Sequence, residues 1–210
     1  MKIDPKIYDA DYFERGIESG KSCYQNYRWI PELTIPMAMT VLEFLKLSRD
    51  EKVLDFGCAK GFLVKALRLL HRQVWGIDVS EYAISQVPQE TKDFCRLPWD
   101  ERPGFPHMFD TCIAKDVFEH IHEGEIDMVL KTIPAQALFA VIPLGDDGVF
   151  RAKANNYDVT HVLCKSEKWW LDTFNKNGWH AYWWGFRIDG IKDSYYQSNP
   201  HGHGFFLLAR

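Results

Sequence analysis

Long apolar runs are missing from this chain of 210 residues. No stretch approaches the roughly 20 consecutive apolar residues that a membrane helix needs. The N-terminus, residues 1–5, also lacks the apolar segment of a secretory signal peptide. These absences exclude a membrane-spanning class of protein, and we expect a cytoplasmic protein with no membrane partner.

An excess of positive charge is missing as well. The chain has 25 Lys and Arg against 29 Asp and Glu, for a net charge of -4. It has no basic run of five or more residues that would attract a phosphate backbone. The charge therefore predicts no nucleic-acid partner.

Cysteine is sparse, and no two cysteines form a C-x-x-C pair. The five are Cys23, Cys58, Cys95, Cys112 and Cys164. An odd number at wide spacing argues against a disulfide framework or a structural zinc site. Free thiols in a reducing cytosol are the interpretation that fits.

Apolar segments of two kinds alternate along the chain. We expect strands over 53–56, 73–78, 92–94, 109–114, 137–142, 179–187 and 204–209, and helices over 36–47, 62–71, 82–87, 117–130 and 167–176. Such alternation predicts an α/β, Rossmann-like sheet of seven mostly parallel strands with helices on both faces. No helix is expected between the last two strands, so they should form an antiparallel hairpin at the edge. We expect one domain over 1–210, with its core in 36–210.

Residues 1–35 are rich in aromatic side chains and poor in regular periodicity. Asp9 or Asp11 is placed to cap a short helix in this segment. The aromatic residues are Tyr8, Tyr12, Phe13, Tyr24, Tyr27 and Trp29. Two interpretations stay open: a structural cover over one side of the core, or a lid that closes over a small ligand.

Acidic residues close three successive expected strands, at Asp55, Asp78 and Asp93. Ligands of open parallel sheets bind at these carboxyl ends. Asp78 stands seventeen residues beyond Gly61, the placement of an acid that accepts hydrogen bonds from ribose hydroxyls. Only Gly57 and Gly61 of a dinucleotide-type glycine pattern are present. Asp55 would repel a pyrophosphate but suits a cationic ammonium.

These segments resemble the class I S-adenosylmethionine-dependent methyltransferases, in particular their small-molecule, type 11/12-like group. The resemblance rests on residues 53–61, 74–80, 92–99 and 109–121, with Ala59 where the family commonly has a third glycine. It implies S-adenosyl-L-methionine as cofactor, with Asp78 on the ribose, Asp55 and Gly57 along the methionine part, and Asp93 and Phe94 beside adenine. The full implied cofactor set is Asp55, Phe56, Gly57, Cys58, Gly61, Asp78, Val79, Asp93, Phe94 and Lys115.

Methyl transfer needs a base only if the acceptor atom carries a proton. His161 is the first candidate for that base, and His120, with Glu119 as an acid partner, is the second. A structural role is the alternative for both histidines. No metal site is expected, because His201 and His203 lack a third ligand nearby and suit a mobile loop better.

Five tryptophans gather in the last third of the chain, at Trp169, Trp170, Trp179, Trp183 and Trp184. They either pack the last helix against the final hairpin or stack on a flat ligand.

The function expected is methyl transfer to a small molecule, with oxygen favoured as acceptor and nitrogen and carbon open. A nucleic-acid or protein methyltransferase is the enzymatic alternative, although the chain has neither an Asn-Pro-Pro-Tyr-type sequence nor a Pro-Cys dipeptide. A non-catalytic module that binds the cofactor is the alternative of another class. Nothing in the sequence indicates an oligomeric state.

Overall fold

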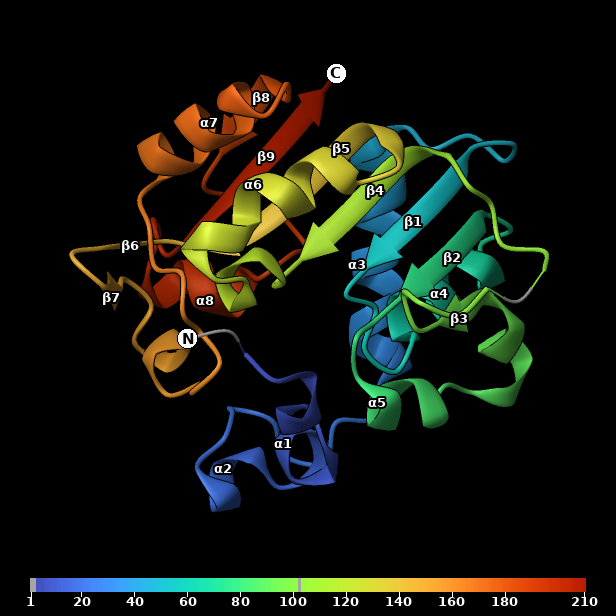
Figure 1. Cartoon of the computed structure of the whole chain (residues 1–210), viewed down its shortest axis with the longest axis horizontal. Helices are drawn as coiled ribbons and strands as arrows, with labels where there is room; N and C mark the ends of the chain where they lie inside the picture. Colours follow the sequence, from blue (N-terminus) through green and yellow to red (C-terminus); the bar gives the residue numbers. More distant parts are fainter. Residues whose placement is uncertain (1–2, 102) are drawn as a thin grey trace.

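A twisted sheet flanked by helices forms the centre of the molecule (Figure 1). The computed structural model describes residues 3–101 and 103–210. In this part of the chain seven strands lie in the order β3-β2-β1-β4-β5-β9-β8. They are β1 Lys52–Phe56, β2 Gln73–Ile77, β3 Cys95–Arg96, β4 Phe109–Lys115, β5 Ala135–Pro143, β8 His180–Gly185 and β9 His203–Ala209. A separate hairpin joins β6 Gly145–Asp146 and β7 Val149–Phe150.

The helices connect these strands and cover the two faces of the sheet. The α-helices are α1 Ala10–Glu14, α2 Gly16–Ser19, α3 Pro31–Leu45, α4 Phe62–Leu69, α5 Glu81–Ser85, α6 Glu123–Thr132, α7 Glu167–Lys176 and α8 Asp193–Ser198. Short 3-10 helices span Pro5–Ile7, Gln89–Phe94, Phe118–His120 and Lys153–Asn156.

The strand directions confirm the predicted Rossmann-like architecture. Strands β1 to β5 pair in parallel, whereas β9 runs antiparallel to both β5 and β8. The chain moves outward from β1 to β3 and then returns to place β4 on the other side of β1. This reversal of strand order opens a crevice at the carboxyl ends of β1 and β4.

Two apolar cores lie on opposite faces of the sheet. Consecutive strand residues point to opposite faces, so Val53 packs with the core that includes α3 and α4 while Leu54 joins the other core. Trp170 and Trp179 are fully buried in this second core, and the Trp179 ring nitrogen donates to the Leu130 carbonyl at 2.9 Å. These two tryptophans pack the core, as the first of the two interpretations expects.

Helix caps follow the sequence closely. Asp9 accepts a hydrogen bond from the Tyr12 amide at 3.0 Å and caps α1. The Ser80 hydroxyl accepts from the Ala83 amide at 2.9 Å and caps α5. Helix α7 has the predicted bounds. Short polar side chains before an apolar run are reliable helix starts because they satisfy amide groups left free in the first turn.

Four expectations about the helices and strands are wrong. Helix α3 begins at Pro31 rather than at Pro36, because a proline is well tolerated in the first turn of a helix. The third strand is Cys95–Arg96, since residues 89–94 form a 3-10 helix. The helix expected over 117–130 is a 3-10 turn followed by α6, and the short helix α8 lies between the last two strands, where no helix is expected.

The aromatic N-terminal segment lies beyond the carboxyl ends of β1 and β4 (Figure 1). Glu14 forms an ion pair with Lys60 of the turn after β1 and accepts a hydrogen bond from the Tyr82 hydroxyl at 2.8 Å. On the opposite side, the Tyr12 hydroxyl donates to Asp158 at 2.7 Å. The segment therefore bridges the crevice from the β1 turn to the loop that follows β7.

None of the described helices combines the length and the apolar character that a membrane crossing requires.

Candidate cofactor and acceptor site

The turn between β1 and α4 brings backbone amide groups to the crevice. Gly57 has a φ of +79°, and a Cβ atom at this position would lie 2.5 Å from Val117 Cγ2. The amides of Gly57 and Cys58 both donate to the Ile77 carbonyl, at 2.8 and 3.0 Å. Glycine suits this position because it adopts a positive φ without strain and has no Cβ atom to clash with Val117.

Ala59 takes the left-handed conformation that a glycine would otherwise supply, with a φ of 47°. Its amide donates to Asp78 Oδ2 at 2.7 Å, and the Ser80 amide donates to Asp78 Oδ1 at 2.8 Å. Both hydrogen bonds hold the carboxylate at the end of β2, on the wall of the crevice. Each oxygen keeps a lone pair for a ligand hydroxyl.

Asp55 is a buried carboxylate inside β1, 4% exposed. Burial raises the pKa of Asp55 to about 7, Lys115 opposes the rise, and the negative charge of Asp78 adds to it. Burial also raises the pKa of Asp78, against the hydrogen bonds from Ser80 and Ala59. Two carboxylates near one cavity favour a ligand that carries positive charge.

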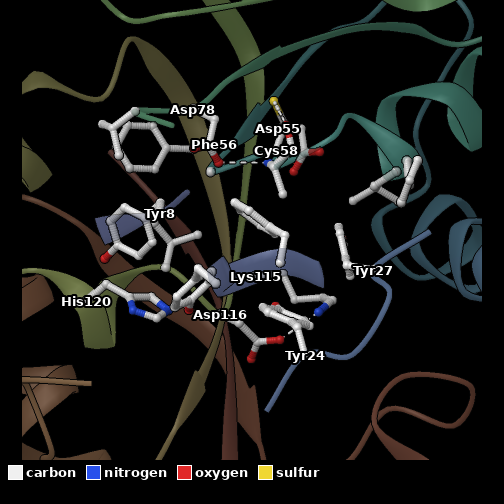
Figure 2. Close-up of a pocket in the computed structure, with 18 of the residues that line it drawn as sticks. Tyr8, Tyr24, Tyr27, Asp55, Phe56, Cys58, Asp78, Lys115, Asp116 and His120 are labelled. Carbon is white, nitrogen blue, oxygen red and sulfur yellow. Dashed lines mark hydrogen bonds and ion pairs between the residues drawn. The ribbon is translucent and has the colours of Figure 1, made fainter. Parts of the chain in front are cut away.

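A cavity of about 780 Å³ lies between the strand ends and the N-terminal segment. Figure 2 shows Tyr8, Tyr24 and Tyr27 facing the acids of β1 and β2 across it. Of the predicted cofactor residues, those that line the cavity are Asp55, Phe56, Gly57, Cys58, Asp78, Val79 and Lys115. Seven of the predicted positions are therefore brought together in one place.

Three predicted cofactor residues do not line this cavity. Asp93 is exposed on the 3-10 helix before β3, so it does not stand at the carboxyl end of a strand. Phe94 packs under the Arg68 guanidinium, 3.0 Å from the ring centroid. Gly61 caps α4, where a Cβ atom would lie 2.8 Å from Cys95 Sγ. On this side of the cavity the lining includes Pro98 with Val79.

A charged group that the sequence analysis missed lies at the base of the cavity. Lys115 and Lys192 each place their ammonium 2.7 Å from Asp116 Oδ2. These two cations hold the pKa of Asp116 well below its usual range, despite burial. Lys192 comes from the segment between β8 and β9. It lies 76 residues from Asp116 in the sequence, and no local sequence pattern predicts a contact over that separation.

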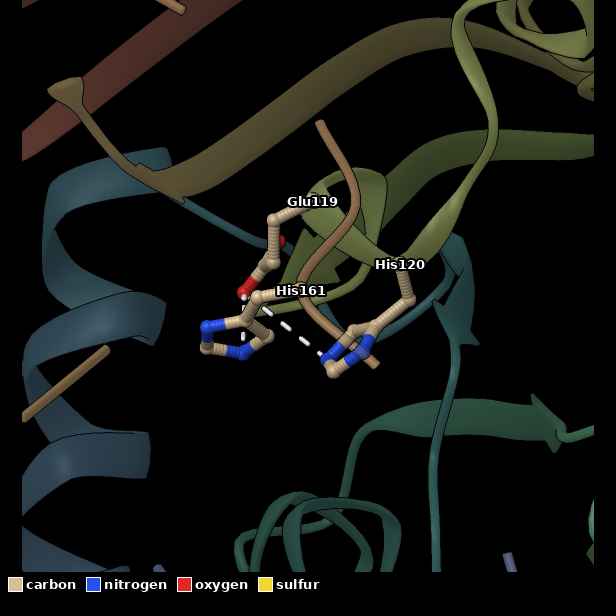
Figure 3. A group of neighbouring side chains, drawn as sticks. All are labelled: Glu119, His120 and His161. Carbon is tan, nitrogen blue, oxygen red and sulfur yellow. Dashed lines mark ion pairs between the residues drawn. The ribbon is translucent and has the colours of Figure 1, made fainter. Parts of the chain in front are cut away.

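The two predicted catalytic histidines lie together, with ring centroids 4.7 Å apart. His120 lines the cavity and its ring faces Tyr8 (Figure 2), whereas His161 does not line the cavity. Their Nε2 atoms are each 4.0 Å from Glu119 Oε1 (Figure 3). Burial, together with the neighbouring His161, lowers the pKa of His120 to about 4, so its imidazole is neutral at pH 7.

His201 and His203 have separate surroundings. His203 opens β9, is 4% exposed and packs against Tyr195, so the interpretation of this residue as part of a mobile loop is wrong. Burial and the charge of Lys192 lower the pKa of His203 to about 3. His201 instead packs against Phe186, with ring centroids 4.5 Å apart.

Comparison with known proteins gives this arrangement its class. A family model described as a methyltransferase domain matches residues 36–203. Strands β1 to β5, the turn after β1 and the acid after β2 lie within the matched region. The chain belongs to this methyltransferase-domain family, the class I S-adenosylmethionine-dependent methyltransferases.

A curated relative and two solved structures illustrate the likeness. The chain is 30% identical over 118 residues to an O-antigen chain terminator bifunctional methyltransferase/kinase of Escherichia coli. That alignment covers 56% of this chain but only 15% of the relative's length.

Among solved structures, mitomycin 7-O-methyltransferase has a TM-score of 0.60 at 14% identity, over 93% of this chain and 65% of its own. Geranyl diphosphate C-methyltransferase from Streptomyces coelicolor has a TM-score of 0.59 at 12% identity, over 82% and 79%. Likeness at this identity shows the fold alone.

The residues present fit S-adenosylmethionine, the cofactor of this family. The cavity wall offers a buried carboxylate at Asp55, an acceptor carboxylate at Asp78 and a backbone that a ligand approaches closely at Gly57. A ligand with an ammonium, a ribose and no phosphate suits this set of groups.

Proposed function

We propose that this protein transfers a methyl group from S-adenosylmethionine to a small-molecule acceptor, with oxygen as the favoured acceptor atom. The observation that carries the proposal is the cavity of about 780 Å³ under the N-terminal tyrosines. Its volume lies in the range of about 300–1,000 Å³ typical of small-ligand sites. A segment that bridges the crevice suits a small acceptor better than a duplex or a folded protein.

The cofactor half of the site follows from the carboxylates and the turn. We assign the ribose hydroxyls to Asp78, the ammonium to Asp55 and close backbone approach to Gly57, with Val79 and Pro98 on the adenine side. When bound, the cofactor supplies a methyl group on a sulfonium whose departure leaves a neutral thioether. The chain then has to orient the acceptor in line with that methyl group and exclude water.

The acceptor half lies at the other end of the cavity, around His120 and Asp116. Of the two predicted bases, we assign the acceptor end to His120, because His161 does not line the cavity. Tyr8 and Tyr24 of the N-terminal segment face this end (Figure 2). The segment thus acts as a lid, and we infer that 1–35 forms one domain with the core.

Cofactor affinity should depend on pH through Asp55. Its pKa is about 7 because of burial, so the carboxylate ionises as the pH rises from 6 to 8, and the ionised form attracts the cofactor's ammonium. We expect the dissociation constant to fall by up to about tenfold over this range, because the gain is limited to one proton. The measurement is calorimetric titration with S-adenosylmethionine at several pH values.

Asp55→Asn is the control for this pH dependence. It keeps the side chain's size and leaves the other two charged groups that face Asp55, namely Lys115 and Asp78, in place. Its affinity should be lower and its pH profile flat. An unchanged slope in this variant would assign the proton to another group.

The acceptor class is tested with cofactor carrying a labelled methyl group. The protein is incubated with separate small-molecule, nucleic-acid and protein fractions of a cell extract, and the label is followed into each. We expect label in the small-molecule fraction, on oxygen. Label only in nucleic acid or protein would favour the macromolecular alternative, and cofactor binding without transfer to any fraction would favour a non-catalytic module.

The cytoplasmic location stays a prediction. None of the five cysteines forms a disulfide, which suits a reducing compartment.

A further inference from the structure

Three metal-binding side chains converge beside the acceptor end of the cavity. Glu119, His120 and His161 each offer one ligand atom, and these atoms lie within 4.8 Å of one another. Glu119 and His120 belong to the 3-10 helix after β4, and His161 comes from the loop before α7. Figure 3 shows the carboxylate of Glu119 pointing between the two imidazoles.

The carboxylate of Glu119 is buried and has no hydrogen-bond donor in the described part of the chain to offset the cost of its burial. The residue is 0% exposed, and neither carboxylate oxygen has a hydrogen-bond partner among the described residues. Its backbone is fixed, because the Glu119 carbonyl accepts from the amides of Val162 and Leu163 at 2.9 and 3.0 Å. A buried carboxylate without a partner is costly, so this geometry calls for a ligand that carries positive charge.

Hydrogen bonds behind the two imidazoles fix their tautomers. The Thr160 hydroxyl donates to Asp158 Oδ1 at 2.6 Å, so its oxygen accepts from His120 Nδ1–H at 2.8 Å. His161 Nδ1 lies 2.7 Å from the Asn155 carbonyl, which only accepts, so this nitrogen also carries the proton. Both Nε2 atoms therefore face Glu119 as lone pairs. Metal-ligating histidines are typically oriented by such hydrogen bonds from the other ring nitrogen.

We propose that Glu119, His120 and His161 bind a divalent first-row transition metal ion. Two imidazoles and one carboxylate are ligands that suit such ions and leave coordination positions open. A tetrahedral ion with ligands at about 2.1 Å holds neighbouring donor atoms about 3.4 Å apart. The two Nε2 atoms at 4.0 Å from Glu119 Oε1 therefore need to approach it by only about 0.6 Å. This proposal departs from the sequence analysis, which expects no metal site.

The role of the ion rests on the proposed function. His120 borders the cavity, so an open coordination position on that side would hold the acceptor's oxygen and increase the acidity of its hydroxyl. The O–H bond then breaks with the proton lost to water. A new O–C bond forms to the methyl carbon as the C–S bond breaks, with its electron pair kept by sulfur. The ion would take the place of a histidine base.

Cobalt binding to the full-length chain tests the site directly. After treatment with a chelator, the protein is titrated with Co²⁺ and its d–d absorption is recorded, with Zn²⁺ as competitor. We expect one ion per chain, displaced by Zn²⁺, with no thiolate charge-transfer band. Glu119→Gln keeps the shape of the side chain and should weaken binding by about 100-fold. Absence of stoichiometric binding by the native chain, or equal binding by Glu119→Gln, would overturn the proposal.

Two further variants separate ligation from general damage. Thr160→Val keeps the volume but removes the oxygen that orients His120, and it should weaken Co²⁺ by about tenfold. His180→Ala removes an exposed histidine of β8 and should leave binding unchanged. If Glu119→Gln fails to fold, His161→Gln takes its place with the same expected loss and the same outcome that overturns the proposal.

The proposed function and the metal site are tested by separate measurements. Binding of S-adenosylmethionine to the metal-free chain is measured by calorimetry, because Asp55 and Asp78 are not part of the metal site. Transfer of label that persists in the presence of chelator would overturn the metal's role alone. Bound metal without transfer to any small molecule would contradict the proposed function and leave the metal site in place.

Discussion

Asp78→Ala should weaken S-adenosylmethionine binding by about 100-fold or more and leave the sheet intact. A hydrogen bond to a charged group contributes about 1.5–3 kcal/mol. In Asp78→Ala, each of the two ribose hydroxyls would lose its hydrogen bond to the carboxylate. A loss of about 3 kcal/mol corresponds to roughly 100-fold in the dissociation constant. Part of the loss arises from the turn itself, because Asp78 also accepts from the amides of Ala59 and Ser80. Calorimetric titration measures the effect, with circular dichroism as the check on folding.

Asp110→Ala is the matched control for this experiment. Asp110 is an exposed acid that, like Asp78, accepts a backbone hydrogen bond, in its case from the Lys52 amide at 2.8 Å. It lies near the start of β4, at the opposite end of the strands from the cavity. Its removal should leave cofactor affinity unchanged. A dissociation constant for Asp78→Ala equal to that of the native chain would refute the ribose assignment.

Gly57→Ala should destabilise the fold by about 2–5 kcal/mol and abolish cofactor binding. The φ of +79° costs about 1–2 kcal/mol for a residue with a Cβ atom. That Cβ would also lie 2.5 Å from Val117 Cγ2, and overpacking of this kind costs about 1–3 kcal/mol. Relief of the clash would displace the turn into the cofactor's place. Urea unfolding measures the stability, and calorimetry measures the binding.

Two further variants separate the strain from the clash. Gly178→Ala has nearly the same φ, +80°, but its Cβ would meet nothing within 4 Å, so it should cost only about 1–2 kcal/mol. In Gly57→Ala with Val117→Ala, the clashing methyl groups are gone. The two substitutions should therefore couple by about 1–3 kcal/mol in the favourable direction. Simple additivity would show that the methyl contact is not the cause.

The sheet could be predicted because its signals are local. Runs such as residues 53–56 and 137–142 are apolar enough to indicate buried strands, and the polar caps Ser80 and Ser166 mark where helices begin. The strand expected over residues 92–94 is wrong because a 3-10 helix and a short strand give similar sequence patterns over so few residues. With that shift, Asp93 does not line the cavity.

The proposed acceptor half of the site depends on contacts between distant segments. Lys192 meets Asp116 only because α8 and the loop around it return to the carboxyl end of β4. His161 and Glu119 approach because the loop before α7 bonds to the Glu119 carbonyl. The sequence supplied His120 and His161 as separate candidates, and neither their order of importance nor their shared carboxylate could be read from spacing.

Calorimetric titration of the native chain with S-adenosylmethionine tests the central claim most directly. The fold, the turn at Gly57 and the carboxylates of Asp55 and Asp78 predict one binding site per chain with a dissociation constant in the micromolar range. S-adenosylhomocysteine, which lacks the transferable methyl group, should compete for the same site. Absence of binding at millimolar cofactor would contradict the account.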